Sequence, residues 1–283
     1  MFKRFLIFVL FNIFSANLSI SAFAAQESQQ LRIITTVPPI ASIFASIGKD
    51  KVKISSIASA NECAHNYSIK PSQAAGLRYA DLFVYVDDNF ELYVPKIIKS
   101  ASAKILKLSD LGGIKLIKNG DDINWHFWLN LNNVEEVATA AFHTLAELRP
   151  NDKEYFSANY GAFIKKVHDM QGILDKIIVL NPIYISPELD YLFTNNKSII
   201  THFVNMNNLS PTNVESLRQL TNQYSAKCIF ASDHLNSAKI QEIVGKIKVV
   251  TLEAETWSYV SGYEQLFTEY FNKIVYSLEH CKN

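Results

Sequence analysis

The chain alternates between runs typical of strands and runs typical of helices, and this alternation constrains its fold more than any other feature. Residues 31–48 predict a β-branched strand, a Pro-Pro turn and an amphipathic helix. A second strand is predicted at 51–59, and a helix that opens at Pro71 or Ser72 leads to a strand at 81–87. Strands that alternate with helices in this way indicate α/β units on mostly parallel sheets.

A long stretch of helical periodicity separates two such blocks. Apolar residues at helical spacing predict a helix over 132–150 and a second, longer helix over 151–179. The strand–helix alternation then resumes and closes with an amphipathic helix over about 263–278. We therefore expect two α/β lobes joined by one long helix. The expected divisions are a signal peptide at 1–24, an N-terminal lobe at 25–150, a linking helix at 151–179 and a C-terminal lobe at 180–283.

The first two dozen residues have the features of a secretory signal. Lys3 and Arg4 precede an apolar run over 5–14 that is too short to span a bilayer. Ala22 and Ala24 then fit the small-residue pattern of a cleavage site. We expect export to the periplasm followed by cleavage, and the alternative is an uncleaved membrane anchor.

Charge and cysteine content narrow the possible partners and the redox setting. The 27 basic and 27 acidic residues balance, so no net field attracts nucleic acid or an anionic membrane. Cys63, Cys228 and Cys281 allow one disulfide and one leftover thiol in an oxidising compartment. Pairing Cys281 with Cys228 would fasten the C-terminus and contribute roughly 4 kcal/mol. Cys63 would then be free or would pair with another molecule.

Three blocks of the sequence resemble a known family. They are AHNYSIKPSQ with YADLFVYVDDNFE (64–73 and 79–91), WHFWLNLNNVEEVATAAFHTLAELRPNDKEYF (125–156), and AKCIFAS with EHCKN near the C-terminus. In this order they resemble the zinc- and manganese-binding receptors of ABC importers, of ZnuA type. The resemblance implies two α/β lobes bridged by one long rigid helix, with the metal in the cleft between the lobes. It also implies that Cys228 and Cys281 form a disulfide.

The resemblance implies metal ligands at particular positions. His65 falls on the first family ligand and His126 on the second. The fourth, an acidic residue after a strand, falls on Glu253. The third falls closest to Ser186, which departs from the family's histidine or glutamate. Glu188, two residues further on, is the strong oxygen ligand nearby.

Two imidazoles and two carboxylates would suit a divalent transition metal. Zn²⁺ prefers four nitrogen, sulfur or carboxylate ligands, whereas Mn²⁺ and Fe²⁺ accept more oxygens. We expect Zn²⁺, with Mn²⁺ or Fe²⁺ as alternatives. Four aromatic residues near the candidate ligands could exclude water from the site: Tyr67, Trp125, Trp128 and Trp257.

Each candidate also has a structural interpretation. His65 could be an ordinary loop histidine, His126 a packed histidine bonded to a carbonyl, and Glu253 a solvated charge. His202 and His234 lie near expected strand ends of the second lobe and could replace a missing ligand. Two other histidines fall on helices and are expected at the surface or at lobe contacts: His143 and His168.

The sequence favours a binding protein over an enzyme. The leading hypothesis is a monomeric periplasmic receptor that captures zinc and delivers it to the permease of an inner-membrane ABC importer. One alternative is a degenerate family member that binds metal weakly or not at all and serves another solute or partner. The other is a metal-assisted periplasmic hydrolase with an open coordination position. The sequence contains neither H-E-x-x-H nor G-x-S-x-G, and we assign no catalytic residue.

Overall fold

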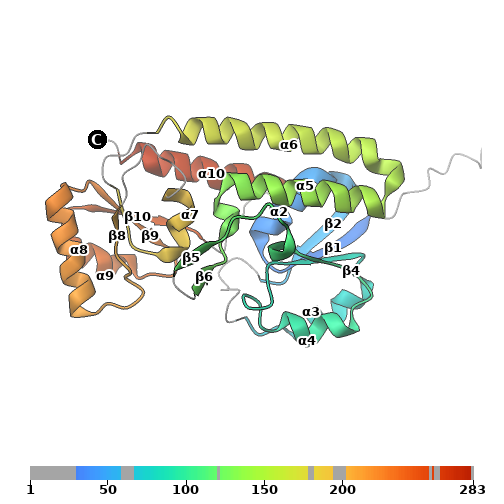
Figure 1. The fold of residues 1–283 in the computed structure, drawn as a ribbon, viewed down its shortest axis with the longest axis horizontal. Coiled ribbons are helices and arrows are strands. Elements are labelled where there is room, and N and C mark those ends of the chain that lie inside the picture. The colour runs from blue at the N-terminus through green and yellow to red at the C-terminus, as the bar shows by residue number, and fades with distance from the viewer. Residues whose placement is uncertain are drawn as a thin grey trace, which may run out of the picture. The chain divides into compact units, whose positions relative to one another are not determined.

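The computed structural model describes most of the chain after the expected signal peptide (Figure 1). The described residues are 30–58, 67–119, 122–177, 182–193, 202–254, 257 and 262–281. His65, Cys63 and residues 1–24 lie outside these ranges, so the expectations about them stay predictions.

The first sheet has four parallel strands in the order β2-β1-β3-β4. They are β1 (Leu31–Thr35), β2 (Val52–Ser56), β3 (Leu82–Tyr85) and β4 (Lys104–Lys107). All four residues of β3 are buried, which explains why its sequence is continuously apolar rather than alternating. Two short helices also belong to this region: α3 (Pro71–Gly76) and α4 (Val94–Ile97).

Helix α2 (Pro38–Gly48) lies in the interior of the protein. Every residue except Ser46 is buried, because the helix contacts β1, β2 and the three long helices described below. The predicted Pro-Pro turn is wrong in one respect. Pro38 and Pro39 are the first two residues of the helix, where a fixed φ suits the helix and no N–H is needed.

The second sheet repeats the parallel arrangement in the order β10-β9-β7-β8. Its strands are β7 (Ile183–Tyr184), β8 (His202–Phe203), β9 (Cys228–Ser232) and β10 (Lys248–Leu252). Its helices are α7 (Asp190–Phe193), α8 (Pro211–Tyr224) and α9 (Ser237–Val244). The central strand β9 is buried along its whole length.

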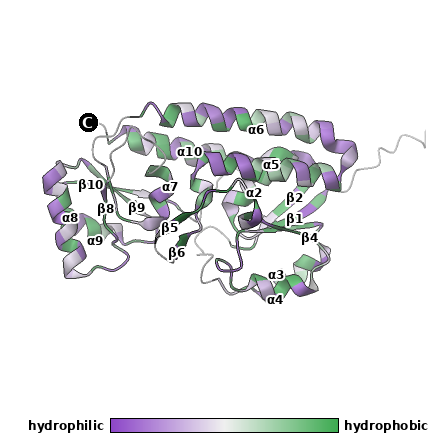
Figure 2. Cartoon of the chain, in the orientation of Figure 1, coloured by the Kyte–Doolittle hydropathy of each residue, from purple (hydrophilic) through white to green (hydrophobic). Residues whose placement is uncertain are grey.

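Three long helices lie together above the sheets in Figure 1: α5 (Leu131–Leu148), α6 (Lys153–Leu174) and α10 (Tyr263–Glu279). Helix α6 shows alternating hydrophilic and hydrophobic bands in Figure 2, and its buried face includes Phe156, Phe163 and Val167. The predicted long helix is therefore present but shorter at both ends than 151–179. Residues 150–152 form a separate helical turn, and the chain leaves the helix at Asp175.

One hydrophobic core extends from the first sheet to the second. It includes Ile33 and Val84 of the first sheet, Phe163 of α6, and Phe230 and Trp257 of the second half of the chain. This continuity couples the two lobes mechanically, because close-packed interiors transmit displacement. The fold-class prediction of two mostly parallel α/β lobes with one long helix is confirmed. The residue boundaries proposed for the lobes stay a prediction.

A short antiparallel hairpin stands apart from both parallel sheets. It consists of β5 (Ile117–Asn119) and β6 (Asp122–Asn124). His126 follows β6 of this hairpin rather than a strand of the first parallel sheet.

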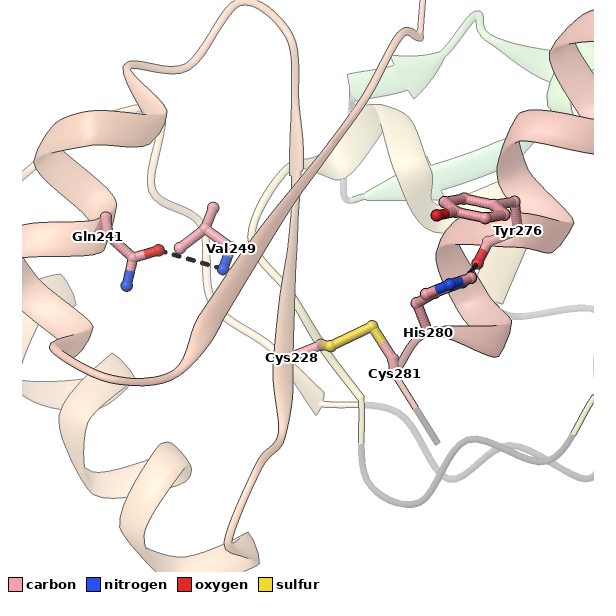
Figure 3. Close-up of a disulfide and its surroundings, with 6 residues drawn as sticks. All are labelled: Cys228, Gln241, Val249, Tyr276, His280 and Cys281. Carbon is pink, nitrogen blue, oxygen red and sulfur yellow. Dashed lines mark hydrogen bonds between the residues drawn. A yellow bond between two sulfur atoms is a disulfide. The ribbon is translucent and has the colours of Figure 1, made fainter. Parts of the chain in front are cut away.

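A disulfide joins the C-terminal helix to the second sheet. Figure 3 shows Cys228, at the start of β9, bonded to Cys281, which lies just beyond α10. Both cysteines are buried. This is the pairing that the sequence led us to expect.

Candidate metal-binding site

His126 lies where the hairpin meets a helical turn formed by Phe127–Leu129. The residue is only 3% exposed. The rings of Phe90 and Trp128 pack edgewise against the imidazole, with centroid distances of 6.0 and 5.3 Å. This packing fixes the plane of the ring, as the interpretation of His126 as a packed histidine requires.

Asn124 determines which nitrogen of His126 carries the proton. The Asn124 Nδ2 donates to the carbonyl oxygen of Pro187 at 2.7 Å, and its Oδ1 accepts the backbone N–H of His126 at 3.0 Å. The same Oδ1 lies 3.0 Å from His126 Nδ1. Because an amide oxygen can only accept, Nδ1 is the donor and the neutral ring has its lone pair on Nε2. A histidine oriented in this way is prepared to bind a metal ion.

The hairpin is bonded directly to the second half of the chain. The buried Tyr191 hydroxyl of α7 donates to the Asn124 carbonyl oxygen at 2.8 Å and accepts the Ile117 N–H at 2.9 Å. Burial raises the pKa of Tyr191 to about 12, so the hydroxyl keeps the proton that it donates. The Trp128 indole N–H also donates to the carbonyl oxygen of Ala254, at 2.9 Å. These bonds hold His126 against the second lobe.

Buried Glu91 supports the turn that carries Phe90. Its carboxylate accepts the backbone N–H groups of Val86 at 3.1 Å and Asp87 at 2.9 Å. Burial raises the pKa of Glu91 from its usual 4.5 to about 7, although the two N–H donors act in the opposite direction. The position of the ring against His126 therefore depends on a buried acid.

A cavity of about 320 Å³ opens beside His126. Side chains from the hairpin and from loops of the second sheet line it together. The lining residues are Asp122, Ile123, Asn124, Trp125, His126, Pro187, Glu188, Phe203, Asn205 and Asn207. Two of the residues expected to bind metal, His126 and Glu188, thus reach the same cavity from opposite lobes.

Glu188 lies in the turn after β7, and its two carboxylate oxygens differ. Oε1 is 3.9 Å from His234 Nε2, whereas Oε2 is buried and has no hydrogen-bond partner among the described residues. Burial of an unsatisfied carboxylate oxygen is costly. A bound cation or an N–H donor in the cavity would relieve that cost.

His234 is placed beside Glu188 by two further contacts. Its Nδ1 is 2.8 Å from Ser232 Oγ, and its Nε2 is 3.2 Å from Asn207 Oδ1. Of the two histidines expected as replacement ligands, His234 therefore lies at the edge of the cavity. His202 lies elsewhere, with its ring stacked on Tyr224 at a centroid distance of 3.5 Å.

Ser186, which falls closest to the expected third ligand, has a structural role. It is fully buried, and its hydroxyl oxygen accepts the backbone N–H of Ser232 at 2.8 Å. The bond ties the end of β7 to the end of β9. Ser186 is not among the described residues that line the cavity.

Glu253 follows β10 directly, as expected, but its carboxylate forms an ion pair. Glu253 Oε1 lies 2.7 Å from Lys273 Nζ of α10. Its backbone carbonyl oxygen accepts the Tyr270 hydroxyl. Glu253 is not among the described residues that line the cavity, so the structure does not place it beside His126 and Glu188 there.

The expected aromatic wall is only partly found. Trp125 lines the cavity, whereas Trp128 and Trp257 are fully buried in the core. Trp257 stacks on Tyr270 at a centroid distance of 4.0 Å. Tyr67 belongs to a separate apolar cluster of the first lobe.

The two helix histidines lie at the surface. His143 is exposed, with its ring centroid 5.0 Å from that of Phe142, and His168 Nε2 lies 3.2 Å from Glu135 Oε2. Across the described ranges, no three or more His, Cys, Asp or Glu side chains group closely enough to hold a metal ion. His65 and Cys63 lie outside those ranges.

Two lobes, each built on a sheet of parallel strands, share a cavity that contains an oriented imidazole and a carboxylate. This arrangement defines a two-lobed binding protein. The chain belongs to the ZnuA family, because the family model described as zinc-uptake complex component A, periplasmic, matches residues 33–281. The resemblance noted in the sequence is confirmed. The family is described as a component of a zinc-uptake complex and not as an enzyme, which also confirms the expectation that the chain is not an enzyme.

Several curated proteins are similar to the chain. The "Uncharacterized protein RP014" of Rickettsia prowazekii (strain Madrid E) is 27% identical over 261 residues, which is 92% of this chain and 86% of the relative. The high-affinity zinc uptake system protein ZnuA of Haemophilus ducreyi is 25% identical, over 51% of this chain and 58% of its own. The manganese-binding lipoprotein MntA of Halalkalibacterium halodurans is 20% identical, over 52% and 49% respectively. The last two matches therefore span only about half of each protein.

The fold is also that of a solved structure. A crystal structure of ZnuA superimposes with a TM-score of 0.75 at 20% identity and covers 89% of this chain and 97% of its own. Within the described ranges, we find no helix with the length and hydropathy that a membrane crossing requires.

Sequence reasoning missed several residues that shape the site. Asn124 orients His126, Tyr191 fastens the hairpin, and Asn205 and Asn207 line the cavity. An asparagine two residues before a candidate ligand is a recognisable signal, because its side chain can accept the N–H two positions on. The other three have no comparable signal, since they reach the site through tertiary packing.

Proposed function

We propose that the protein is a periplasmic receptor that captures a divalent transition metal, zinc in the first place, and delivers it to an ABC importer. Family membership and relatives named as zinc- or manganese-binding proteins support this proposal. The signal-like residues 1–24 support the periplasmic location, and the permease of the importer would be the partner.

The observation that carries the proposal is the cavity shared by His126 and Glu188. One lobe supplies an imidazole whose lone pair is set on Nε2, and the other supplies a carboxylate oxygen that has no hydrogen-bond partner in the described part of the chain. Nitrogen and carboxylate donors from two lobes suit Zn²⁺ or Mn²⁺.

The proposed ligands are His65, His126, Glu188 and Glu253. His126 and Glu188 need little rearrangement, since they already line one cavity. Glu253 would have to exchange its ion pair with Lys273 for the metal, so its contribution should be smaller. His65 enters on its place in the family motif alone.

The shared core supports release of the metal through small movements rather than wide opening. Residues of both sheets and of α6 belong to one packed cluster, which resists hinge bending between the lobes. The loops that carry Glu188 and Glu253 would then move when the receptor docks on its permease.

Elemental analysis of the protein as purified, followed by thermal melts of the metal-free form, tests the proposal. Metal at a hundred times its dissociation constant should stabilise the folded state by about 2.7 kcal/mol. We expect a larger shift with Zn²⁺ than with Mn²⁺, an equal shift in the His143→Ala control, and a reduced one in His126→Ala. If the parent shows no metal-dependent shift, the receptor proposal fails.

The second candidate is a degenerate family member with weak or no metal binding. It is favoured by Ser186, whose hydroxyl is committed to the Ser232 N–H where a histidine or glutamate ligand was expected. A parent protein that melts identically with and without metal would support this candidate.

A further inference from the structure

The cavity beside His126 is larger than a bare ion requires. Zinc–ligand bonds are only about 2.0–2.2 Å long for nitrogen and oxygen, so an ion held by protein ligands alone occupies little space. A cavity of about 320 Å³ falls instead at the lower end of the range for small-molecule sites. Its size allows a small organic molecule beside a metal ion.

The lining offers groups suited to an organic molecule. Trp125 and Phe203 present aromatic carbon, and Phe203 is 39% exposed. Asn207 is held in place because its backbone N–H donates to Asn205 Oδ1 at 3.0 Å and its own Oδ1 lies 3.2 Å from His234 Nε2. An amide N–H₂ group fixed in this way can donate to a carboxylate of a bound molecule, whereas a bare cation carries no acceptor.

The charge of the lining selects among such molecules. Asp122 and Glu188 contribute carboxylates, whereas no lysine or arginine is among the described lining residues. Among the described residues the buried Glu188 Oε2 has no hydrogen-bond partner, so it would accept an N–H. A cationic ligand with an amine suits this lining, and a polycarboxylate such as citrate, which would meet two like charges, does not.

From the size, the groups and the charge together, we propose that the cargo enters this cavity as a cationic complex of the metal with a small amino-acid chelator. The His126 Nε2 would complete the coordination of the metal, and in this complex Glu188 would hold the chelator instead of binding the metal directly. The chelator's amine N–H would bond to Glu188 Oε2, and its carboxylate would accept from the Asn207 amide. This inference rests on the proposed function, since it specifies the form in which the metal is bound.

Titration calorimetry and native mass spectrometry on the metal-free full-length mature protein test the inference with three probes. These are Zn²⁺ alone, Zn²⁺ with L-histidine, and Zn²⁺ with citrate. We expect a complex whose mass includes one zinc and one histidine, and an affinity that rises about tenfold when histidine is added. Citrate should compete for the metal and lower the affinity.

Asn207→Ala, with Asn222→Ala as its control, separates the chelator from the metal. Asn222 is an exposed asparagine of α8 outside the cavity lining. Asn207→Ala keeps the backbone N–H bond to Asn205, so the loop is retained. It should abolish the tenfold gain in affinity that histidine gives over Zn²⁺ alone, whereas Asn222→Ala should keep that gain.

Failure of the chelate inference can be distinguished from failure of the receptor proposal. If Zn²⁺ binds alone and histidine merely strips it, with no ternary mass, the chelate inference is overturned and the receptor proposal stands. If Zn²⁺ binds under none of the conditions, the receptor proposal fails and the chelate inference fails with it.

Discussion

The side chains that the two lobes contribute to the cavity differ in how firmly their contacts hold them. On the first-lobe side, His126 is fixed by Asn124 Oδ1 through both its backbone N–H and its ring Nδ1. On the second-lobe side, Glu188 lies 3.9 Å from His234, and its other, buried oxygen has no hydrogen-bond partner within the described ranges. Glu253 is committed to an ion pair with Lys273.

The difference indicates a division of roles between the lobes. A prearranged ligand loses little conformational freedom on binding, so the first-lobe side can supply most of the affinity. Carboxylates that must move or exchange partners adapt to the size and charge of what enters. We infer that the second-lobe side adjusts the choice of metal, and the predictions below test that inference.

The largest expected effect concerns the stability of the second lobe. Replacing both Cys228 and Cys281 by serine should lower the free energy of unfolding by roughly 4 kcal/mol, because the loop between them is no longer closed. Urea denaturation measures the loss, and reducing the parent protein should reproduce it. Equal stability of parent and variant, or alkylation of Cys228 in the unreduced parent, would contradict the pairing.

The stability of the first lobe should depend on pH through Glu91. The folded state keeps its proton up to about pH 7, whereas the unfolded chain releases it near 4.5. The folded state therefore binds more protons between these values, and the contribution of Glu91 to stability falls by about 3 kcal/mol as the pH rises through them.

Glu91→Gln should flatten this dependence when unfolding is followed by urea denaturation between pH 4.5 and 7. The slope, not the absolute stability, is the measured quantity. Glu154→Gln, an exposed glutamate of α6, is the matched control and should keep the parent slope. A parent whose stability is flat across this window would show that Glu91 titrates normally.

Removing the prearranged ligand should weaken metal binding by about a hundredfold, or 2.7 kcal/mol. We expect this for His126→Ala, and for His65→Ala if His65 is the second nitrogen ligand. Calorimetric titration with Zn²⁺ measures the loss. The exposed His143→Ala should bind as the parent does, and similar behaviour of His126→Ala and His143→Ala would place the site elsewhere.

The fold could be predicted from sequence because local patterns encode it. Continuous apolar residues specify the buried strands β3 and β9, and the spacing of buried residues specifies α6. The ends of α6 were missed because they depend on capping contacts. The Asp152 side chain, for example, pairs with Arg149 at 2.6 Å instead of capping the helix.

The site could be predicted only where a motif marks it. His126 stands in a recognisable block of sequence with its orienting partner Asn124 two residues before it, whereas the groups that hold the hairpin and Glu253 come from distant segments. Tyr191 reaches the hairpin from 67 residues away, and Lys273 reaches Glu253 from 20 residues further along the chain. Such contacts exist only after the two lobes have packed on the shared core.

A substitution of Asn124 tests whether metal binding needs the fixed orientation of the His126 ring. Asn124→Ala removes the acceptor for His126 Nδ1 and the bond to the Pro187 carbonyl oxygen. We expect metal binding to weaken ten- to hundredfold, which is typical when a group that orients a ligand is lost. Zn²⁺ titration measures it, with Asn222→Ala as control. Parent-like binding by Asn124→Ala would mean that the ring needs no orienting partner.

The smallest expected effect tests the second-lobe side. Lys273→Ala frees the Glu253 carboxylate from an ion pair in which the lysine is 54% exposed. Such exposed pairs contribute at most about 1 kcal/mol, so the freed carboxylate should strengthen Zn²⁺ binding by up to about fivefold. Lys246→Ala removes the same positive charge from an exposed position before β10 and so controls for the change in net charge. If Lys273→Ala strengthens binding no more than Lys246→Ala does, Glu253 is not a ligand, and the second-lobe contribution comes from Glu188.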